Sequence, residues 1–111
     1  MKKKDFYFLH SDVCKTLANP KRQEILDSLR RREMTVNDLV EKTGISQANL
    51  SQHLGILRNK GIVSARRDGI NVYYSLSNSK IIQAFDLISE VMQDSVASQN
   101  KTIEDAIRTK R

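Results

Sequence analysis

The sequence lacks the residues on which several classes of protein depend. It has no Trp, one Cys and one Pro, and no apolar run long enough to span a membrane. A single Cys can neither close an internal disulfide nor form a thiolate zinc site alone. There is also no Gly-rich phosphate loop, metal-ligand cluster or paired Cys–His nucleophile. We therefore expect neither an enzyme nor a bound metal or cofactor.

The composition that remains is typical of a single globular domain covering residues 1–111. Apolar side chains make up 39% of the 111 residues and charged side chains 29%. The basic N-terminus is followed by an apolar segment that Asp5 and His10 interrupt. This pattern does not match a signal peptide, so we expect a cytoplasmic protein.

The chain is basic, with a net charge of +6 and a pI of about 9.7. Such a charge favours a polyanionic partner, with nucleic acid more probable than a membrane surface. A basic surface that serves only solubility explains the charge equally well, so the charge alone does not decide the function.

Apolar residues recur at helical spacing over most of the chain. The periodic segments are 6–18, 20–32, 36–43, 47–59 and 79–97, with a weaker continuation beyond 97. Asn19, Thr35 and Ser46 are suitable N-caps for the second, third and fourth helices. Gly44 and Gly61 are suitable stops for the third and fourth. We place Arg30, Arg31 and Arg32 in the last turn of the second helix.

The period changes from 3.6 to 2 after Gly61. Residues 62–67 and 71–76 alternate as strands do, and Asp68-Gly69 between them indicates a hairpin. The order of helices, glycine turn, helix, hairpin and helix predicts a winged helix-turn-helix, mainly α with a two-stranded β wing. The helix-turn-helix covers 35–59, the wing covers 62–76, and 79–97 forms a C-terminal dimerisation helix.

The fourth helix has the side chains that recognition of DNA bases requires. No acidic residue occurs between Gln47 and Arg58, whereas an ordinary solvated helix carries Glu and Lys. Amide side chains pair with adenine, and cations near the helix end and on the wing suit phosphates. The predicted DNA-binding residues are Ser46, Gln47, Asn49, Ser51, Gln52, His53, Arg58, Lys60, Arg66 and Arg67. Because neighbours on a strand alternate, Arg66 and Arg67 should point to opposite faces.

One small domain cannot easily cover both the apolar stripe of the last helix and the aromatic first helix. Pairing two chains about a two-fold axis solves this problem, although an intrachain core helix is the alternative. The predicted dimerisation residues are Phe6, Leu9, Ile81, Phe85, Ile88 and Met92.

Several motifs together resemble the ArsR/SmtB family of bacterial and archaeal repressors. They are Leu17-Ala18-Asn19-Pro20-Lys21-Arg22, Ser46-Gln47-Ala48-Asn49-Leu50-Ser51-Gln52-His53-Leu54, Gly61-Ile62-Val63 and Val72-Tyr73-Tyr74-Ser75-Leu76. The resemblance covers about residues 10–95. It implies a homodimeric winged-helix repressor that binds an imperfect palindrome in double-stranded DNA and releases it when an inducer binds.

The inducer sites implied by the resemblance are absent from this sequence. Thr35 and Asn37 stand where arsenic- and lead-type members have a Cys-x-Cys element. The positions that match the zinc ligands of the last helix are Asn78, Lys80, Val91 and Asp94. The redox-sensing members use two cysteines, and this chain has only Cys14. We therefore expect an inducer other than a metal bound by thiolate or His.

Two further features have ordinary explanations. Because a free Cys is usually a small buried hydrophobe, we expect Cys14 to be buried; a bridge between the Cys14 residues of two subunits is the alternative. The acidic row of Asp86, Glu90 and Asp94 is expected to be a solvated face rather than a weak cation site.

The sequence thus predicts a dimeric, sequence-specific DNA-binding repressor. A non-specific architectural DNA-binding protein is one alternative. A winged helix that contacts only proteins is another, although protein interfaces favour aromatic residues and Arg over neutral amides.

Overall fold

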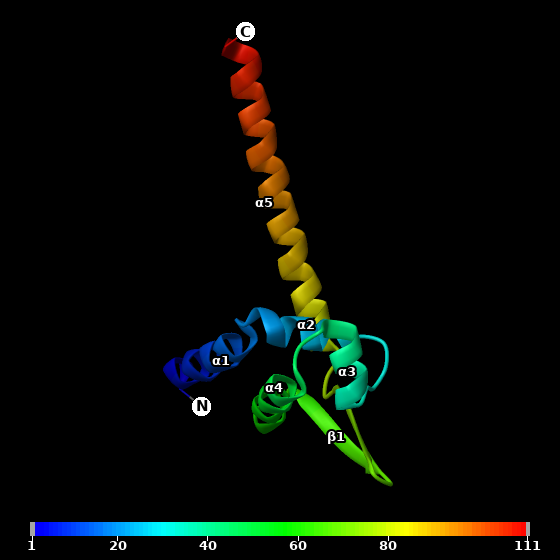
Figure 1. The fold of residues 1–111 in the computed structure, drawn as a ribbon. Coiled ribbons are helices and arrows are strands. Elements are labelled where there is room, and N and C mark those ends of the chain that lie inside the picture. The colour runs from blue at the N-terminus through cyan, green and yellow to red at the C-terminus, as the bar shows by residue number, and fades with distance from the viewer. Residues whose placement is uncertain (1, 111) are drawn as a thin grey trace. The chain divides into compact units, whose positions relative to one another are not determined.

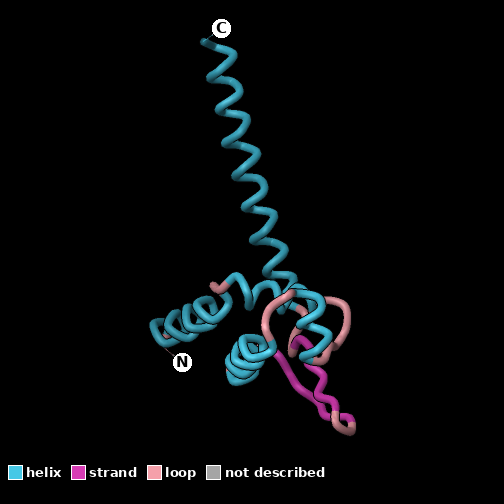
Figure 2. Tube along the Cα trace, viewed as in Figure 1, coloured by secondary structure: helices cyan, strands magenta, loops and turns pink. Residues whose placement is uncertain are grey.

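The structure is a computed structural model that describes residues 2–110, and it divides into two compact units, 1–79 and 80–111. The first unit holds four helices and one hairpin, and the second is a single helix (Figures 1 and 2). The elements are α1 (Lys3–Leu17), α2 (Pro20–Ser28), α3 (Val36–Thr43), α4 (Gln47–Asn59), β1 (Val63–Asp68), β2 (Asn71–Leu76) and α5 (Lys80–Lys110). The predicted winged helix-turn-helix is confirmed.

The predicted helix caps also form. The side chain of Asn19 accepts hydrogen bonds from the backbone of Lys21 and Arg22. Thr35 and Asp38 make a reciprocal capping box, and the hydroxyl of Ser46 accepts from the backbone amide of Asn49. These bonds satisfy amides that the first turn of a helix leaves without a partner.

The turn between α3 and α4 depends on Gly44. This residue has φ +73°, a left-handed conformation that other residues adopt only at a cost. Directly after the turn, Ile45 is buried and α4 begins. The sequence therefore fixes where α3 ends and where α4 starts.

The predicted end of α2 is wrong. The helix ends at Ser28, so Arg30, Arg31 and Arg32 lie in the loop and not in its last turn. The reason lies further along the chain, where Met34 makes a β-bridge with Tyr74. The bridge requires extended backbone at Met34, whereas a helix that continued to residue 32 would leave a single residue for the change from helical to extended backbone.

The last helix is longer than the segment 79–97. It continues without interruption to Lys110. Residues 98–110 contain no Gly or Pro, so their polar side chains do not break the helix. No helix among the described residues combines the length and apolar character needed to cross a membrane.

The core of the first unit lies where α2, α3, α4 and the base of the hairpin meet. The fully buried large side chains are Ile25, Leu39, Leu50, Leu54, Leu57 and Val63. The three leucines of α4 recur at helical spacing and so lie on one side of that helix. Their burial fixes which side of α4 points outward.

The hairpin is joined to the rest of the first unit through Met34. Strands β1 and β2 pair antiparallel, from Val63 opposite Leu76 to Asp68 opposite Asn71. The connection is Gly69 and Ile70, with a positive φ only at Gly69, as a type II′ turn requires. On the other edge of β2, Met34 and Tyr74 exchange two backbone hydrogen bonds of 2.9 and 2.8 Å.

The expectation that Cys14 is buried is wrong. Its side chain is exposed on α1, with Sγ 3.6 Å from Nδ1 of His10. Phe6 and Leu9 on the same helix are also about half exposed, at 54% and 49%. The thiol of Cys14 is therefore open to solvent in the described chain.

Candidate nucleic-acid interface

The predicted base-contacting residues of α4 lie outside the core of the first unit. Gln47, Asn49, Ser51 and Gln52 are all exposed. At 100° per residue, Gln52 lies almost directly opposite the buried Leu50, Leu54 and Leu57. We call these four exposed residues the α4 surface; Gln52 is at its centre.

Gly55 lies near Gln52 on the outward side of α4. Gly55 is in the helix interior, where Gly costs about 1 kcal/mol relative to Ala. A methyl group added at Gly55 would meet no atom within 4 Å, so packing within the chain does not require a glycine there. The backbone of α4 is therefore open to close approach at this point.

His53 lies at the border between this surface and the core. It is half-buried, and its Nδ1 accepts a hydrogen bond of 3.2 Å from Nε of Arg22. Burial, together with the positive charges of Arg22 and Lys21, lowers the pKa of His53. His53 is thus a neutral acceptor for Arg22 rather than an additional cation for DNA.

Arg22 was not singled out from the sequence. Its Nη1 also donates to the backbone carbonyl of Thr16, at 3.1 Å, so this one guanidinium links α1, α2 and α4. Arg22 and His53 are 31 residues apart in the chain. No local pattern indicates such a pairing.

Of the two cations predicted to contact phosphates at the end of α4, Arg58 and Lys60, one already takes part in an ion pair. Arg58 is exposed. Lys60 is also exposed, but its Nζ lies 2.8 Å from Oδ2 of Asp12 on α1. The ion pair offsets part of the positive charge that Lys60 would present to DNA.

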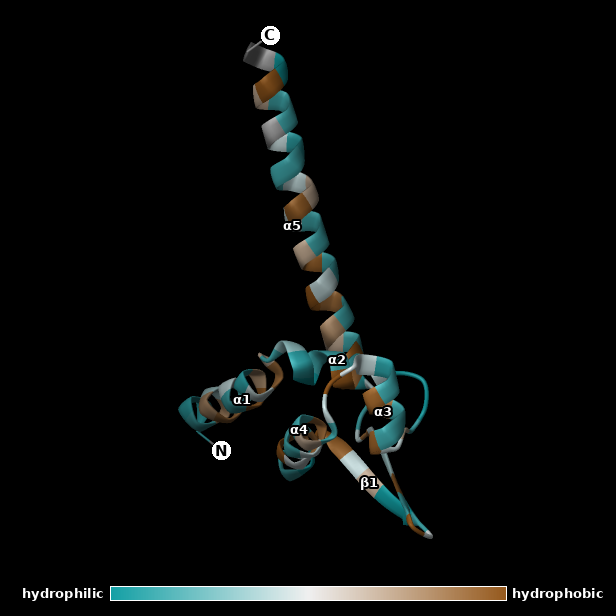
Figure 3. Cartoon of the chain, in the orientation of Figure 1, coloured by the Kyte–Doolittle hydropathy of each residue, from teal (hydrophilic) through white to brown (hydrophobic). Residues whose placement is uncertain are grey.

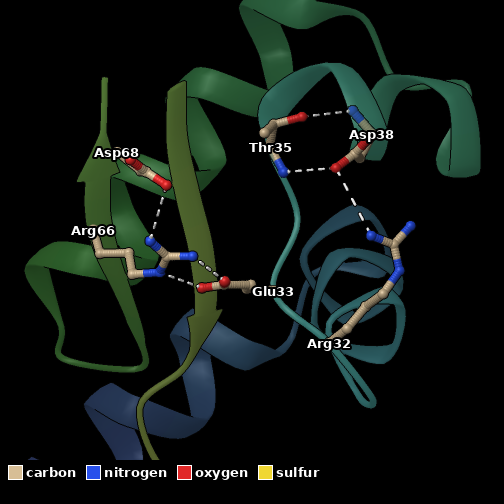
Figure 4. A network of polar contacts seen from close by, with 6 residues as sticks. All are labelled: Arg32, Glu33, Thr35, Asp38, Arg66 and Asp68. Carbon is tan, nitrogen blue, oxygen red and sulfur yellow. Dashed lines mark hydrogen bonds and ion pairs between the residues drawn. The ribbon is translucent and has the colours of Figure 1, made fainter. Parts of the chain in front are cut away.

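The two wing arginines are on opposite faces of the hairpin, as alternation requires. Figure 4 shows Arg66 between Glu33 and Asp68. Nε of Arg66 donates to Oε2 of Glu33 at 2.8 Å, and Nη2 donates to Oε1. The guanidinium also lies over the ring of Tyr73, 4.7 Å from its centroid.

This contact holds the pKa of Glu33 below its usual value, chiefly through the hydrogen bond from Arg66. Arg66 is thus held by the protein, and two of its hydrogen-bond donors are already used. Arg67 is exposed, and among residues 2–110 it has no ion-pair partner. Of the two predicted wing residues, Arg67 is the one that is available to a phosphate.

The predicted dimerisation residues are open in the single chain. Phe6, Leu9, Ile88 and Met92 are exposed, and Ile81 and Phe85 are half-buried. Figure 3 shows that apolar residues recur along α5. Val96 in the same stripe and Val91 beside it are also exposed, as is Leu87 on the other side of the helix.

The part of the chain that the structure describes contains no group of three or more His, Cys, Asp or Glu side chains that could hold a metal ion. The residues at the positions of the family's metal ligands also lack the required chemistry. At the two thiolate positions Thr35 caps α3 and Asn37 has an amide side chain, and at one of the zinc positions Val91 has no ligand atom.

Comparison with known proteins identifies relatives of this chain. The family model of bacterial regulatory protein, arsR family, matches residues 19–65, from the N-cap of α2 into β1. Nodulation protein NolR of Rhizobium meliloti is 46% identical over 78 residues, which are 70% of this chain and 64% of that protein.

Two relatives from mycobacteria match over a greater part of their length. The uncharacterized HTH-type transcriptional regulator MT0088 of Mycobacterium tuberculosis (strain CDC 1551 / Oshkosh) is 38% identical over 102 residues, 87% of this chain and 90% of that protein. A solution structure from Mycobacterium bovis superposes with a TM-score of 0.75 at 31% identity, covering 85% of this chain and 87% of that one. It is a homodimeric winged helix-turn-helix DNA-binding domain of a possible ArsR-family transcriptional regulator.

Proposed function

Because the chain belongs to the ArsR family of bacterial regulatory proteins, we propose that it is a dimeric repressor that binds an inverted repeat in double-stranded DNA. Two α4 surfaces, one from each chain, lie in successive major grooves. Gln47, Asn49, Ser51 and Gln52 contact base edges, and Arg58 and Arg67 contact phosphates.

The observation that carries the proposal is the chemistry of α4. A helix whose outward side has amides and a hydroxyl, with no carboxylate along its length, can approach phosphates without repulsion. Its amides can also donate to and accept from a base at the same time, as pairing with adenine demands. A helix that is exposed only to solvent does not require amides and a hydroxyl without any carboxylate.

The dimer follows from the exposed apolar residues. Phe6 and Leu9 on α1, and Ile88 and Met92 on α5, are each about half to two-thirds exposed in the single chain. Covering such side chains stabilises association, at roughly 25 cal/mol per Å² of apolar surface. The homodimeric mycobacterial relative supports this assembly. A two-fold dimer with its α4 helices about 34 Å apart fits half-sites one helical turn apart.

The mode of regulation is part of the same proposal. Repression with release by an inducer is what the family resemblance implies. The residues at the family's thiolate and zinc positions favour an inducer other than these metals. The protein acts in the cytoplasm on DNA, without catalysis.

Competition binding separates a repressor from a charge-driven DNA-binding protein. The duplex upstream of the protein's own coding region, with its inverted repeat, is compared with a scrambled duplex of equal length at two salt concentrations. A repressor keeps a large ratio of specific to non-specific affinity as salt rises. A charge-driven protein loses affinity for both duplexes together, and that result would contradict the proposal.

A further inference from the structure

A pocket of about 340 Å³ lies between the end of α2, the loop that follows it and α3. The loop contributes Arg30, Arg31 and Arg32 to its wall, and α3 contributes Lys42. The buried side chain of Met34 also lines it. This volume lies within the range of small-molecule pockets, roughly 300–1,000 Å³.

Positive charge dominates the wall of this pocket. Four cations and one carboxylate, that of Asp27, line it among the described residues. The Asp27 carboxylate is already paired with Arg30, whose Nε and Nη2 donate to Oδ1 at 3.0 and 2.8 Å. Because the carboxylate of Asp27 already pairs with Arg30, it does not neutralise the other three cations that line the pocket.

Those three cations are Arg31, Arg32 and Lys42. Within residues 2–110, neither Arg31 nor Lys42 has an ion-pair partner. Nη1 of Arg32 lies 3.9 Å from Oδ2 of Asp38, at the limit of an ion pair, and the Arg32 side chain is 64% exposed. The same Asp38 oxygen accepts a hydrogen bond from the backbone of Thr35 (Figure 4).

Gathering like charges around a concavity is unfavourable, and a bound anion offsets that repulsion. Guanidinium groups donate to phosphate oxygens in pairs, and a lysine ammonium adds a point charge. We propose that this pocket is a binding site for a small phosphorylated anion, with Arg31, Arg32 and Lys42 as its donors.

The site is separate from the α4 surface. In Figure 1 the loop between α2 and α3 lies on the side of α3 away from α4. No residue of α4 or of the hairpin lines the pocket. The ligand is therefore a free anion rather than the phosphates of DNA held against α4.

Titration calorimetry of the full chain with inorganic pyrophosphate, without DNA, tests the proposal. The test variant is Arg31→Ala with Lys42→Ala. The matched control, Lys4→Ala with Lys101→Ala, removes the same charge from exposed positions elsewhere. We expect one saturable site per chain, affinity at least about tenfold weaker in the test variant, and a change below about twofold in the control.

Absence of saturable binding to the unmodified chain would overturn the proposal, as would an equal loss in both variants. The two variants are also compared for affinity to duplex DNA. A loss of DNA affinity confined to the Arg31/Lys42 variant, without pyrophosphate binding by the unmodified chain, would assign these cations to the DNA backbone instead. Because the pyrophosphate arm contains no DNA, its failure leaves the proposed DNA-binding function standing.

Discussion

Gln52 has the central position on the α4 surface, opposite the three buried leucines of the same helix. We expect Gln52→Ala to weaken binding to the preferred duplex by about 1–3 kcal/mol and to relax base preference at one position of each half-site. Gln99→Ala, on α5, is the matched control. Unchanged affinity for every duplex would show that another side of α4 faces the DNA.

Gly55 is a residue whose effect on stability can be measured apart from DNA. Because an added methyl group meets open space in a helix interior, Gly55→Ala should raise the free energy of unfolding by about 1 kcal/mol. Gly61→Ala is the contrast, since φ is +73° there and a side chain strains the backbone. Urea denaturation measures both. A destabilised Gly55→Ala would mean that packing, not access to the helix, requires this glycine.

His53 makes stability depend on pH. Its pKa is lowered in the folded chain, so between that lowered pKa and the ordinary value of about 6.5 the unfolded chain binds a proton that the folded chain does not. Stability should therefore fall as pH decreases from about 7 to 5. In His53→Gln, which keeps an acceptor for Arg22, that part of the decrease should vanish. An identical pH profile for the two proteins in urea denaturation would contradict this assignment.

At the scale of elements, the wing has one arginine held by the protein and one that is open. Arg67→Ala should weaken binding to all duplexes to a similar extent and reduce the slope of log affinity against log salt by about 1 for each chain, or about 2 for the dimer. Arg66→Ala should alter the slope less, because Glu33 already pairs with Arg66. Electrophoretic mobility shifts at several salt concentrations give the slopes. Equal effects of the two substitutions would mean that Arg66 leaves Glu33 when DNA binds.

The elements that the sequence predicted well are those with local causes. Asn19, Thr35 and Ser46 each bond to amides two or three residues away, so the starts of three helices follow from neighbouring residues. The outward side of α4 follows from the spacing of Leu50, Leu54 and Leu57. Here, local chemistry and tertiary packing favour the same structure.

The features that were not predicted from the sequence depend on contacts between residues that are distant in the chain. The end of α2 is set by the bridge between Met34 and Tyr74, and the state of Arg66 by Glu33, 33 residues away. Likewise, the exposure of Cys14 depends on what packs against α1, which its neighbours in the sequence do not determine. A sequence without an alignment gives no signal for such pairings.

At the scale of the whole molecule, α1 and α5 present apolar side chains that one chain leaves open. Ile88, with 63% of its side chain exposed, is replaceable without disturbing the core of the first unit. Placing a carboxylate there should disfavour association, because burying an unpaired charge is costly. The proposed function needs two α4 surfaces at a fixed spacing, so a chain that cannot pair should also bind DNA weakly.

The most direct test is sedimentation velocity of the unmodified chain and of Ile88→Glu, alone and with the inverted-repeat duplex. We predict a dimer that binds as two chains per duplex, and a monomeric variant with an affinity at least about tenfold lower. Saturation at one chain per duplex, or an Ile88→Glu variant that binds as tightly as the unmodified chain, would contradict the account.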